Sequence, residues 1–355
     1  MNYRPTRLVI EEEVADSPLV QRVLATLSDT PVNWVGQVED DAAPGDGSVL
    51  EIVRFRGRFI KPCPGTRTYT CCGYQILHLG IQCSLGCTYC ILQAYFPKSN
   101  MRLFANLDDM VQQLEGHLRA SHKQVNRIGT GEFTDSLLLD PLTGASETLV
   151  PFFARKSNAV LELKTKTVQV DLLEKLEHGG RTVVAWSLNP EEVIAAEEAA
   201  TASLEQRIAA ARRCQSWGYR LAFHFDPLIA YPNWKQGYAE VVHRLFSTVD
   251  PSGVAWISLG ALRFMPSLKP IIRKRYPKSI ILAEEFVPGL DGKMRYFRDL
   301  RVNMFRHLSN LLRGVNRDIC VYLCMESEDV WRESLGFAPV ERGGLNALLD
   351  RQALL

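Results

Sequence analysis

The chain has 355 residues and a formal net charge of +1, and 46% of its residues are hydrophobic. These values are typical of a globular protein with one large α/β domain plus additions, and they exclude a disordered chain and a global field that attracts nucleic acid. No apolar run has the length of a membrane span or of a signal-peptide core, so we expect a cytoplasmic protein without a membrane partner.

Residues 1–58 are predicted to form an appended N-terminal segment. Apolar residues at helical spacing predict a short helix at 17–27, and residues 40–47 have the composition of a turn-rich linker. Residues 49–60 alternate apolar and basic positions, which predicts a strand whose basic face carries Arg54, Arg56 and Arg58. That face suits a phosphate-binding stripe, and it equally suits an exposed edge strand protected by charge.

Three cysteines with C-x3-C-x2-C spacing, Cys83, Cys87 and Cys90, directly follow an apolar run at 74–81. Three converging thiolates suit zinc or an iron–sulfur centre. Structural zinc takes four protein ligands, so Cys71 or Cys72 would have to be the fourth. A [4Fe–4S] cluster on three cysteines instead leaves one iron open for a substrate or cofactor. The spacing of Cys63, Cys71 and Cys72 matches no metal signature, so we expect them to pack around the cluster entrance.

Beyond Cys90, strand patterns and helix patterns alternate about six times. Strands are predicted at 127–133, 159–165, 182–188, 221–225, 254–259 and 319–325, and helices at 103–122, 148–155, 168–177, 203–217, 235–247, 266–275, 300–313 and 328–335. This alternation predicts a parallel sheet with right-handed crossovers, and the strands are too few for an eight-stranded barrel. We therefore expect an α/β fold, a partial (βα)6 TIM-like barrel over 59–335, with additions at 1–58 and a tail at 336–355.

Polar residues follow several of the predicted strands. Because the carboxyl ends of barrel strands face one mouth, we expect these side chains to converge beside the cysteine loop: Glu132, Lys166, Ser187, Asn189 and Asp226.

The cysteine loop, with Tyr89 just before its last cysteine, resembles the cluster loop of radical S-adenosylmethionine (SAM) enzymes. In that superfamily SAM chelates the open iron, and one electron cleaves it to methionine and a 5′-deoxyadenosyl radical. Within the superfamily, residues from about 59 to 300 resemble spore photoproduct lyase, which reverses a UV-induced thymine dimer in DNA. The matching motifs include Lys61-Pro-Cys-Pro, Cys71-Cys-Gly-Tyr, Thr165-Lys, Ser187-Leu-Asn, Asn233-Trp and Arg275-Tyr-Pro-Lys.

The resemblance implies site roles. Cys83, Cys87 and Cys90 would bind a [4Fe–4S] cluster, and Tyr89 would lie by the adenine of SAM. Glu132 ends the sequence Thr-Gly-Glu, which is similar to the superfamily's Gly-Gly-Glu motif, and it would bind the SAM amino group. Lys166 and Ser187 would hold the methionine carboxylate, and Asn189 would contact the ribose. The alternatives are that Lys166 pairs with a neighbouring carboxylate and that Ser187 caps a helix.

The chain departs from the family's pattern at two positions. The family's hydrogen-donor cysteine corresponds to Phe133, and a tyrosine of its radical-return path corresponds to Ile91, whereas Tyr89 of that path is kept. We therefore expect another residue to donate the hydrogen atom, and Cys324 is the candidate. The alternative is that Cys324 is only a packed thiol of the core. The departures also leave open a radical SAM enzyme for a small molecule, tRNA or protein.

The resemblance also implies partners. An external donor such as a flavodoxin or ferredoxin would supply the electron. DNA would bind through local basic patches, one of which comprises Lys269, Arg273, Lys274, Arg275 and Lys278. The remaining alternative is a non-enzymatic, zinc-stabilised nucleic-acid-binding protein.

Overall fold

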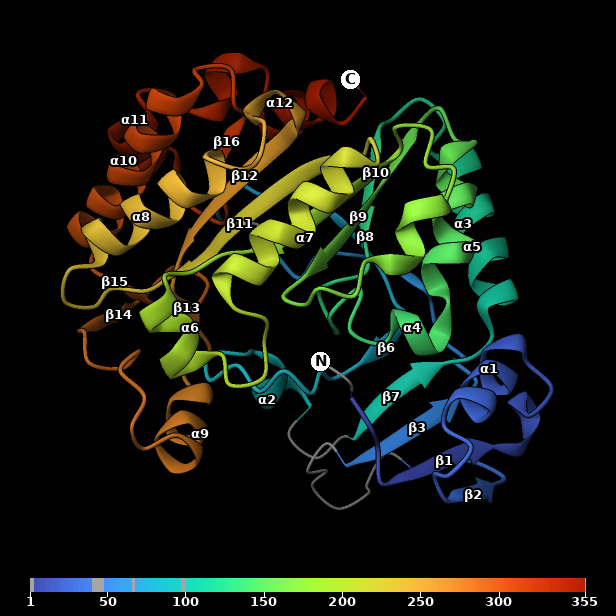
Figure 1. The fold of residues 1–355 in the computed structure, drawn as a ribbon. Coiled ribbons are helices and arrows are strands. Elements are labelled where there is room, and N and C mark those ends of the chain that lie inside the picture. The colour runs from blue at the N-terminus through green and yellow to red at the C-terminus, as the bar shows by residue number, and fades with distance from the viewer. Residues whose placement is uncertain (1–2, 40–47, 66–67, 97–99, 355) are drawn as a thin grey trace.

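The computed structural model describes residues 3–39, 48–65, 68–96 and 100–354 (Figure 1), so the predicted linker at 40–47 lies outside the described residues. Its largest sheet has eight strands in the order β16-β12-β11-β10-β9-β8-β5-β4. All neighbours pair in parallel except β4 and β5. The strands are β4 (Ile60–Pro62), β5 (Gln75–Leu77), β8 (Asn126–Gly129), β9 (Ala159–Thr165), β10 (Thr182–Ser187), β11 (Arg220–Leu228), β12 (Val254–Ala261) and β16 (Val321–Leu323).

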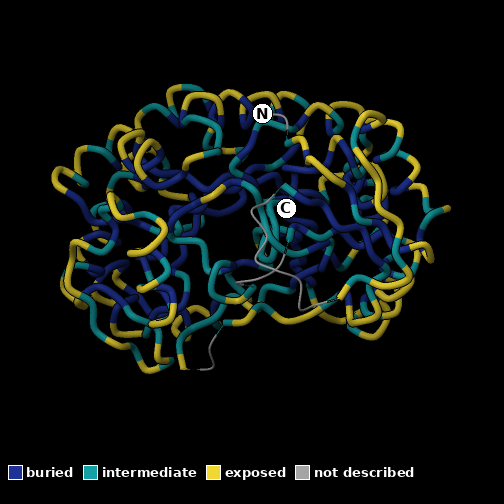
Figure 2. Tube along the Cα trace, turned by 90° about the horizontal axis from the view of Figure 1, so that it is seen from below, coloured by how far each residue is buried: buried dark blue, intermediate teal, exposed yellow. Residues whose placement is uncertain are grey.

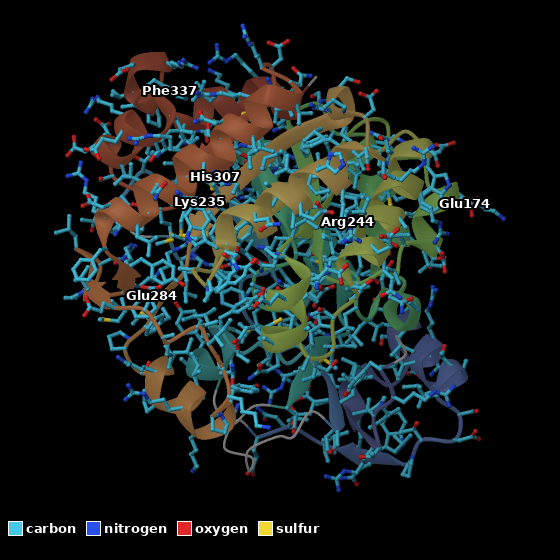
Figure 3. The ribbon with its side chains drawn as sticks, turned by 60° about the vertical axis from the view of Figure 1, so that its left-hand side comes forward. Glu174, Lys235, Arg244, Glu284, His307 and Phe337 are labelled. Atoms are coloured by element: carbon cyan, nitrogen blue, oxygen red, sulfur yellow. The ribbon has the colours of Figure 1, made fainter. Side chains whose placement is uncertain are left out.

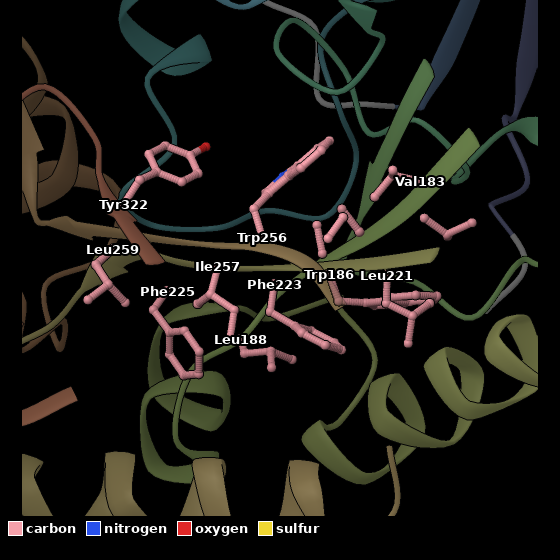
Figure 4. Close-up of a cluster of buried hydrophobic side chains, with 14 of the residues drawn as sticks. Val183, Trp186, Leu188, Leu221, Phe223, Phe225, Trp256, Ile257, Leu259 and Tyr322 are labelled. Carbon is pink, nitrogen blue, oxygen red and sulfur yellow. The ribbon is translucent and has the colours of Figure 1, made fainter. Parts of the chain in front are cut away.

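Helices that lie between these strands in the chain, together with α11 after β16, cover the outer face of the curled sheet (Figure 1): α3 (Leu107–Ala120), α5 (Ala145–Ala154), α7 (Leu204–Ser216), α8 (Trp234–Phe246), α10 (Arg298–Val315) and α11 (Glu328–Leu335). Strand residues alternate between the two faces. Phe223 and Phe225 of β11 point towards the helices, whereas Trp256 and Tyr322 point the opposite way (Figure 4). Buried residues accordingly run through the interior and exposed ones follow the rim (Figure 2). The expected partial barrel is confirmed.

Neighbouring helices are also joined at the surface. His307 of α10 donates from Nε2 to the carbonyl oxygen of Lys235 on α8 at 2.9 Å, and Figure 3 places both residues where the two helices meet. The helix α12 (Leu345–Ala353) belongs to the expected tail. It buries Leu345 and Leu349 in the main hydrophobic core of the barrel.

A second sheet, in the order β2-β1-β3-β7-β6, lies beside the barrel at the lower right of Figure 1. It consists of β1 (Arg7–Glu11), β2 (Val32–Val35), β3 (Val49–Val53), β6 (Gly80–Ile81) and β7 (Met101–Phe104), with α1 (Pro18–Thr26) packed on it. Ser17 caps α1 by accepting from the backbone N–H of Val20, which confirms the predicted helix. The apolar run before the cysteine loop is therefore divided, because β5 joins the barrel and β6 joins this second sheet.

A third, antiparallel sheet has the order β13-β15-β14, with β13 (Arg263–Phe264), β14 (Phe286–Pro288) and β15 (Met294–Tyr296). The remaining helices are α2 (Leu92–Tyr95), α4 (Asp140–Thr143), α6 (Glu191–Glu197) and α9 (Leu268–Arg275), with 3-10 turns η1 (Glu12–Val14), η2 (Asp171–Lys175), η3 (Pro251–Gly253) and η4 (Pro339–Arg342). Among the described residues, no helix combines the length and the apolar character needed to cross a membrane.

Four element predictions are wrong in part, one of them the strand at 127–133, which ends at Gly129. The strand at 49–60 ends at Val53, because side chains take over the next backbone donors: Arg54 N–H donates to Glu11 at 2.8 Å and Phe55 N–H to Asn106 at 2.9 Å. The helix at 103–122 begins only at Leu107, because β7 bridges β3 and β6. The helix at 168–177 is only the 3-10 turn η2.

Candidate functional site

A cavity of about 790 Å³ lies between the carboxyl ends of the barrel strands and the second sheet. We call it the first cavity. It brings together most of the residues singled out from the sequence: Cys83, Cys87, Cys90, Tyr89, Glu132, Lys166 and Ser187. The expected convergence of strand-end side chains beside the cysteine loop is thus seen for these residues.

The cysteine loop is shaped by two left-handed residues, Gln82 with φ of 71° and Gly86 with φ of 65°. It is fastened to the barrel by Thr88, whose N–H donates to the carbonyl oxygen of Glu197 at 2.9 Å and whose hydroxyl donates to the Glu197 carboxylate. The loop therefore lies against the C-terminal end of α6.

The three cysteine thiols fit a metal cluster in chemistry and placement. Burial raises the pKa of Cys83 and Cys90, and raises that of Cys87 to about 12, so without a metal they stay protonated. A metal binds the thiolate form, so binding of a cluster would release these protons. No three His, Cys, Asp or Glu side chains of the described residues are grouped closely enough for one metal ion. A [4Fe–4S] cluster does not require such a group, because each thiolate binds its own iron.

The carboxylate of Glu198 is the centre of the polar network beside the loop. Its Oε1 accepts from Lys166 Nζ at 2.8 Å and from the Tyr89 hydroxyl, and its Oε2 accepts from Arg207 Nη2 at 2.5 Å. Burial alone would raise the pKa of this carboxyl, but Lys166 and Arg207 outweigh it and hold the pKa well below its usual range. Lys166 thus pairs with a neighbouring carboxylate, which was the alternative to its binding the SAM carboxylate. It nevertheless lines the first cavity.

Asn189 belongs to the same network and not to the cavity wall. Its Nδ2 donates to Glu198 at 3.0 Å, and its Oδ1 accepts from the hydroxyl of Tyr238 at 2.8 Å. The side chain is 1% exposed and is not among the described residues that line either cavity. Its amide is therefore used to hold Glu198, and through it Tyr89.

Asp135 organises the end of β9. Its Oδ1 accepts from the hydroxyl of Thr165 at 2.7 Å, and its Oδ2 accepts from the backbone N–H of Lys166 at 2.8 Å. These bonds aim Lys166 into the first cavity. Nearby, Lys164 Nζ lies 3.5 Å from the carboxylate of Glu132, so this expected SAM contact has an internal partner.

A second cavity of about 320 Å³ adjoins the first inside the barrel, and the two share Tyr89, Cys90, Ile91, Gly131, Glu132, Lys164, Lys166 and Ser187. Four further thiols line it: Cys63, Cys71, Cys72 and Cys324. Burial raises the pKa of Cys63 to about 12 and raises those of Cys72 and Cys324, whereas a hydrogen bond from Cys72 lowers that of Cys71. Cys63, Cys71 and Cys72, which were expected to pack around the cluster entrance, thus line a cavity that also contains Cys90.

Cys324 and Asp226 both line this second cavity, and both are bonded to Arg263. The carboxylate of Asp226 accepts two hydrogen bonds from Arg263, each of 3.0 Å. The same guanidinium donates to the sulfur of Cys324 at 3.3 Å. Cys324 is thus held with its sulfur at the wall of a cavity that also contains Cys90 and Tyr89.

Phe133 turns away from both cavities. Its ring packs on His78 with centroids 4.4 Å apart, and it is not among the described residues that line either cavity. Ile91, in contrast, lines both cavities. The two departures from the family pattern therefore differ. Phe133 lies outside both cavities, whereas Ile91 places an apolar side chain at the cavity wall where the family pattern has a tyrosine.

The basic stripe predicted from Arg54, Arg56 and Arg58 is mostly neutralised. Arg54 pairs with Asp109 at 2.6 Å, and Arg56 pairs with Glu13. The structure therefore gives the phosphate-binding interpretation no support, because two of the three cations already have carboxylate partners.

Sequence reasoning missed Glu198, Arg207 as its partner, and Asp135. None of them belongs to a short motif with the cysteine loop, and Tyr89 and Glu198 are 109 residues apart. Only Asp135, a carboxylate just beyond a strand, follows the pattern used for the other site residues.

Comparison with known proteins agrees with this arrangement. A family model described as spore photoproduct lyase matches residues 70–293. Spore photoproduct lyase of Geobacillus sp. is 29% identical over 293 residues, covering 80% of this chain and 86% of that protein. The enzyme of Clostridium acetobutylicum is 22% identical over 306 residues, covering 82% and 90%.

Solved structures show the same fold. A spore photoproduct lyase mutant with bound AdoMet and dinucleoside spore photoproduct aligns with a TM-score of 0.80 at 23% identity, covering 91% of this chain and 100% of that one. A complex with the dinucleoside spore photoproduct gives a TM-score of 0.79 with the same coverage. Since the family model spans well over half of the chain, this protein belongs to the spore photoproduct lyase family of radical SAM enzymes.

Proposed function

We propose that the protein repairs a UV-induced thymine dimer, the spore photoproduct, in cytoplasmic DNA. The observation that carries this is one site in which the cysteine loop, Lys166 and Ser187 line a first cavity that continues into a second, thiol-lined one. Both volumes lie in the range of ordinary ligand pockets. The family assignment sets aside the non-enzymatic zinc protein.

The first cavity would hold the two cofactors. Cys83, Cys87 and Cys90 would bind a [4Fe–4S] cluster, and Glu132 would contact the amino group of SAM. Lys166 and Ser187 would contact its carboxylate, a charge-assisted pairing. When bound, the reduced cluster supplies the electron that cleaves SAM to methionine and a 5′-deoxyadenosyl radical.

Asn189 and Glu198 would act through Tyr89. Because the Asn189 amide is already bonded to Glu198 and Tyr238, we assign it a positioning role in place of the ribose contact first expected. Glu198 in turn fixes the hydroxyl of Tyr89 and the ammonium of Lys166, both at the cavity wall. This would place the Tyr89 ring beside the adenine.

Cys324 would donate the hydrogen atom that the family takes from the position of Phe133. In this step the S–H bond of Cys324 breaks and a C–H bond forms on the substrate radical, leaving a thiyl radical on the cysteine. A donor thiol must be protonated and reach the substrate. Burial keeps the pKa of Cys324 raised, and its sulfur lines the second cavity.

The Cys324→Ala variant tests this assignment. Product radicals that receive no hydrogen atom should be diverted to side products, while SAM cleavage continues. Cys320→Ser is the control, because Cys320 lies on the same strand segment but is not among the described residues lining the second cavity. Unchanged thymine yield in Cys324→Ala would remove Cys324 from the mechanism.

A second candidate is a radical SAM enzyme for another substrate. The position of Phe133, packed on His78 outside both cavities, favours a changed hydrogen donor or a changed substrate. The experiment is anaerobic reduction of the reconstituted protein with SAM, with and without DNA that contains spore photoproduct. Restored thymine supports the first function. Production of 5′-deoxyadenosine with no effect of the DNA supports the second.

Two partners follow from this function. DNA would bind through local basic groups, so its affinity should fall as salt rises. An external one-electron donor of the flavodoxin or ferredoxin kind would reduce the cluster.

A further inference from the structure

The segment from Leu268 to Lys278 carries a cluster of cations without compensating acids. We call it the basic α9 surface; it consists of Lys269, Arg273, Lys274, Arg275 and Lys278. No Asp or Glu occurs in the sequence between Asp250 and Glu284. Within the described chain none of the five cations makes an ion pair, and all but Lys269 are exposed. A charge cluster of this kind sets up a local field although the whole chain is nearly neutral.

The helix is anchored so that this surface stays turned outwards. Leu268 and Ile272 of α9 are 0% and 1% exposed and join the main hydrophobic core. In Figure 1, α9 projects below the barrel, next to α2 of the cysteine loop. Four of the five cations are therefore presented on this anchored helix, and Lys278 follows just beyond its end.

Hydrogen bonds link this surface to the cysteine loop in two places. Arg275 Nη1 donates to Gln93 Oε1 at 3.2 Å, and Gln93 Nε2 donates to the carbonyl oxygens of Cys87 at 3.2 Å and Thr88 at 3.1 Å. One side chain thus separates the last cation of α9 from the backbone of a cluster cysteine.

The second link passes through Glu197. Its carboxylate accepts from the hydroxyl of Ser279 at 2.7 Å and from the backbone N–H of Ile280 at 2.8 Å. The same carboxylate accepts from the hydroxyl of Thr88 in the cysteine loop. Between the two links, Tyr276 lines the first cavity together with the three cluster cysteines.

We propose that the basic α9 surface is the docking site of an acidic one-electron donor protein that reduces the cluster. The inference rests on the proposed function in that it requires a cluster on the three cysteines. Electron tunnelling weakens steeply with distance, so a donor must dock close to the cluster loop, and this surface is bonded to that loop. Redox partners form small, transient interfaces that are steered by charge, which a short basic helix suits.

DNA is the other polyanion that such a surface could attract. The position of the surface favours the donor, because no described residue from 268 to 280 lines the second cavity, where a nucleobase would bind beside Cys324. Arg275 and Tyr276 line the first cavity instead. The surface therefore faces the cluster and not the substrate.

The test is the charge-reversed variant Arg273→Glu/Lys274→Glu/Lys278→Glu, which leaves Arg275 and its bond to Gln93 in place. The probe is an acidic bacterial flavodoxin. Stopped-flow absorbance should show the rate of cluster reduction by flavodoxin hydroquinone falling at least tenfold, as charge steering predicts. Titration with oxidised flavodoxin should show weaker binding by a similar factor. Reduction by dithionite should be unchanged, and the wild-type rate with flavodoxin should fall as salt rises.

The matched control is Lys123→Glu/Arg155→Glu/Arg317→Glu. These exposed cations precede β8, β9 and β16, so they lie at the opposite end of the sheet. The control should be reduced by flavodoxin at close to the wild-type rate. The milder variant Arg273→Gln/Lys274→Gln/Lys278→Gln removes the three charges without reversing them, and it should give an intermediate rate. It keeps the test valid if the charge-reversed variant does not fold.

Two outcomes would overturn the proposal. One is an unchanged flavodoxin rate in the charge-reversed variant. The other is a loss of duplex DNA affinity in that variant while its flavodoxin rate stays at the wild-type value, which would assign the surface to DNA. Neither measurement uses lesion repair, so a protein that fails to repair spore photoproduct can still confirm the docking site.

Discussion

At the scale of single residues, the site depends on Glu198, a buried carboxylate between two cations. Both the Glu198 and Arg207 side chains are 0% exposed, and Lys166 is 13% exposed. Removing one partner of a buried ion pair leaves an uncompensated charge, which costs more than the pair itself contributes. The same carboxylate accepts from the Tyr89 hydroxyl, so the stability of the fold and the proposed contact of Tyr89 with SAM depend on one group.

We expect Glu198→Gln to lower the free energy of unfolding by about 3 kcal/mol, since Arg207 and Lys166 lose their counter-charge in a buried place. Urea denaturation of the metal-free protein measures this, and equilibrium dialysis of the reconstituted protein should show weaker SAM binding. Glu205→Gln is the control, because Glu205 pairs with Arg244 at 2.6 Å but is 77% exposed. That change should cost less than about 1 kcal/mol. Equal stability of the two variants would contradict the role of Glu198.

A second buried carboxylate predicts a pH dependence. Glu162 accepts from His224 at 2.9 Å and from Trp256 at 3.0 Å. Burial alone would raise the pKa of Glu162, but His224, Lys164 and the Trp256 bond outweigh it and lower the pKa to about 2 from 4.5. The depressed pKa stabilises the fold above pH 4.5 by about 3 kcal/mol, and this contribution is lost as the pH falls from 4.5 to 2.

The variant Glu162→Gln lacks the titrating group, so it should be less stable than the wild type by about 3 kcal/mol at pH 6. The difference should shrink steadily below pH 4.5. Urea denaturation at pH 6 and pH 3.5 compares the two proteins in each condition. A difference that stays constant between these two values would show that the carboxylate is not ionised in the folded protein.

Single residues also mark how far the sequence could predict this site. Cys83, Cys87 and Cys90 could be singled out because the ligand set proposed for them is visible as a local spacing. Lys166 and Ser187 were predictable because they follow strand patterns. Glu198 was not, since its role comes from a contact with Tyr89 that only the folded barrel creates.

At the scale of elements, local signals decided which predictions succeeded. The helix at α7 was correct because Ser203 and Gln206 form a capping box that is readable in the sequence. The boundary errors at Arg54 and at Leu103 arose where side chains or neighbouring strands from elsewhere in the chain supplied the hydrogen bonds. Such partners leave no periodic pattern in the segment itself.

The close contact between β8 and the segment before β5 gives an element-scale prediction. A Cβ added at Gly129 would lie 1.5 Å from the hydroxyl oxygen of Tyr74, which lines the second cavity. Gly129→Ala should therefore displace the Tyr74 ring and lower the free energy of unfolding by about 1–3 kcal/mol, the usual cost of overpacking. The measurement is thermal or urea denaturation of the metal-free protein.

Two variants check the cause. Replacing Tyr74 as well, in Gly129→Ala/Tyr74→Leu, should cost less than the sum of the single changes, because the clash is gone. Gly116→Ala in α3 is the control, since its added Cβ meets nothing within 4 Å. That change should stabilise the protein by about 1 kcal/mol. Additive effects of the Gly129 and Tyr74 changes would rule out the clash.

At the scale of the whole molecule, the cysteine loop lies between the barrel and the second sheet and depends on both. The strand before it is divided between the two sheets, with β5 paired to β8 and β6 paired to β7. Leu85 and Cys87 of the loop are buried in a separate hydrophobic cluster with Leu8, Ile10 and Leu50 of the second sheet. The segment at 1–58 therefore forms part of the wall that holds the cluster cysteines.

This arrangement predicts that removing residues 1–58 prevents cluster binding. The truncation would take away β1, β2 and β3, leave β7 without its partner β3, and expose the apolar side of the loop to water. Bound iron and sulfide per chain, with the visible absorbance of the cluster, should fall severalfold after reconstitution. Ile10→Ala is a milder test, because it removes buried apolar volume from the same cluster, costs about 2–5 kcal/mol and leaves the sheet in place. A truncated protein that folds and binds a full complement of iron would show that the barrel alone shapes the loop.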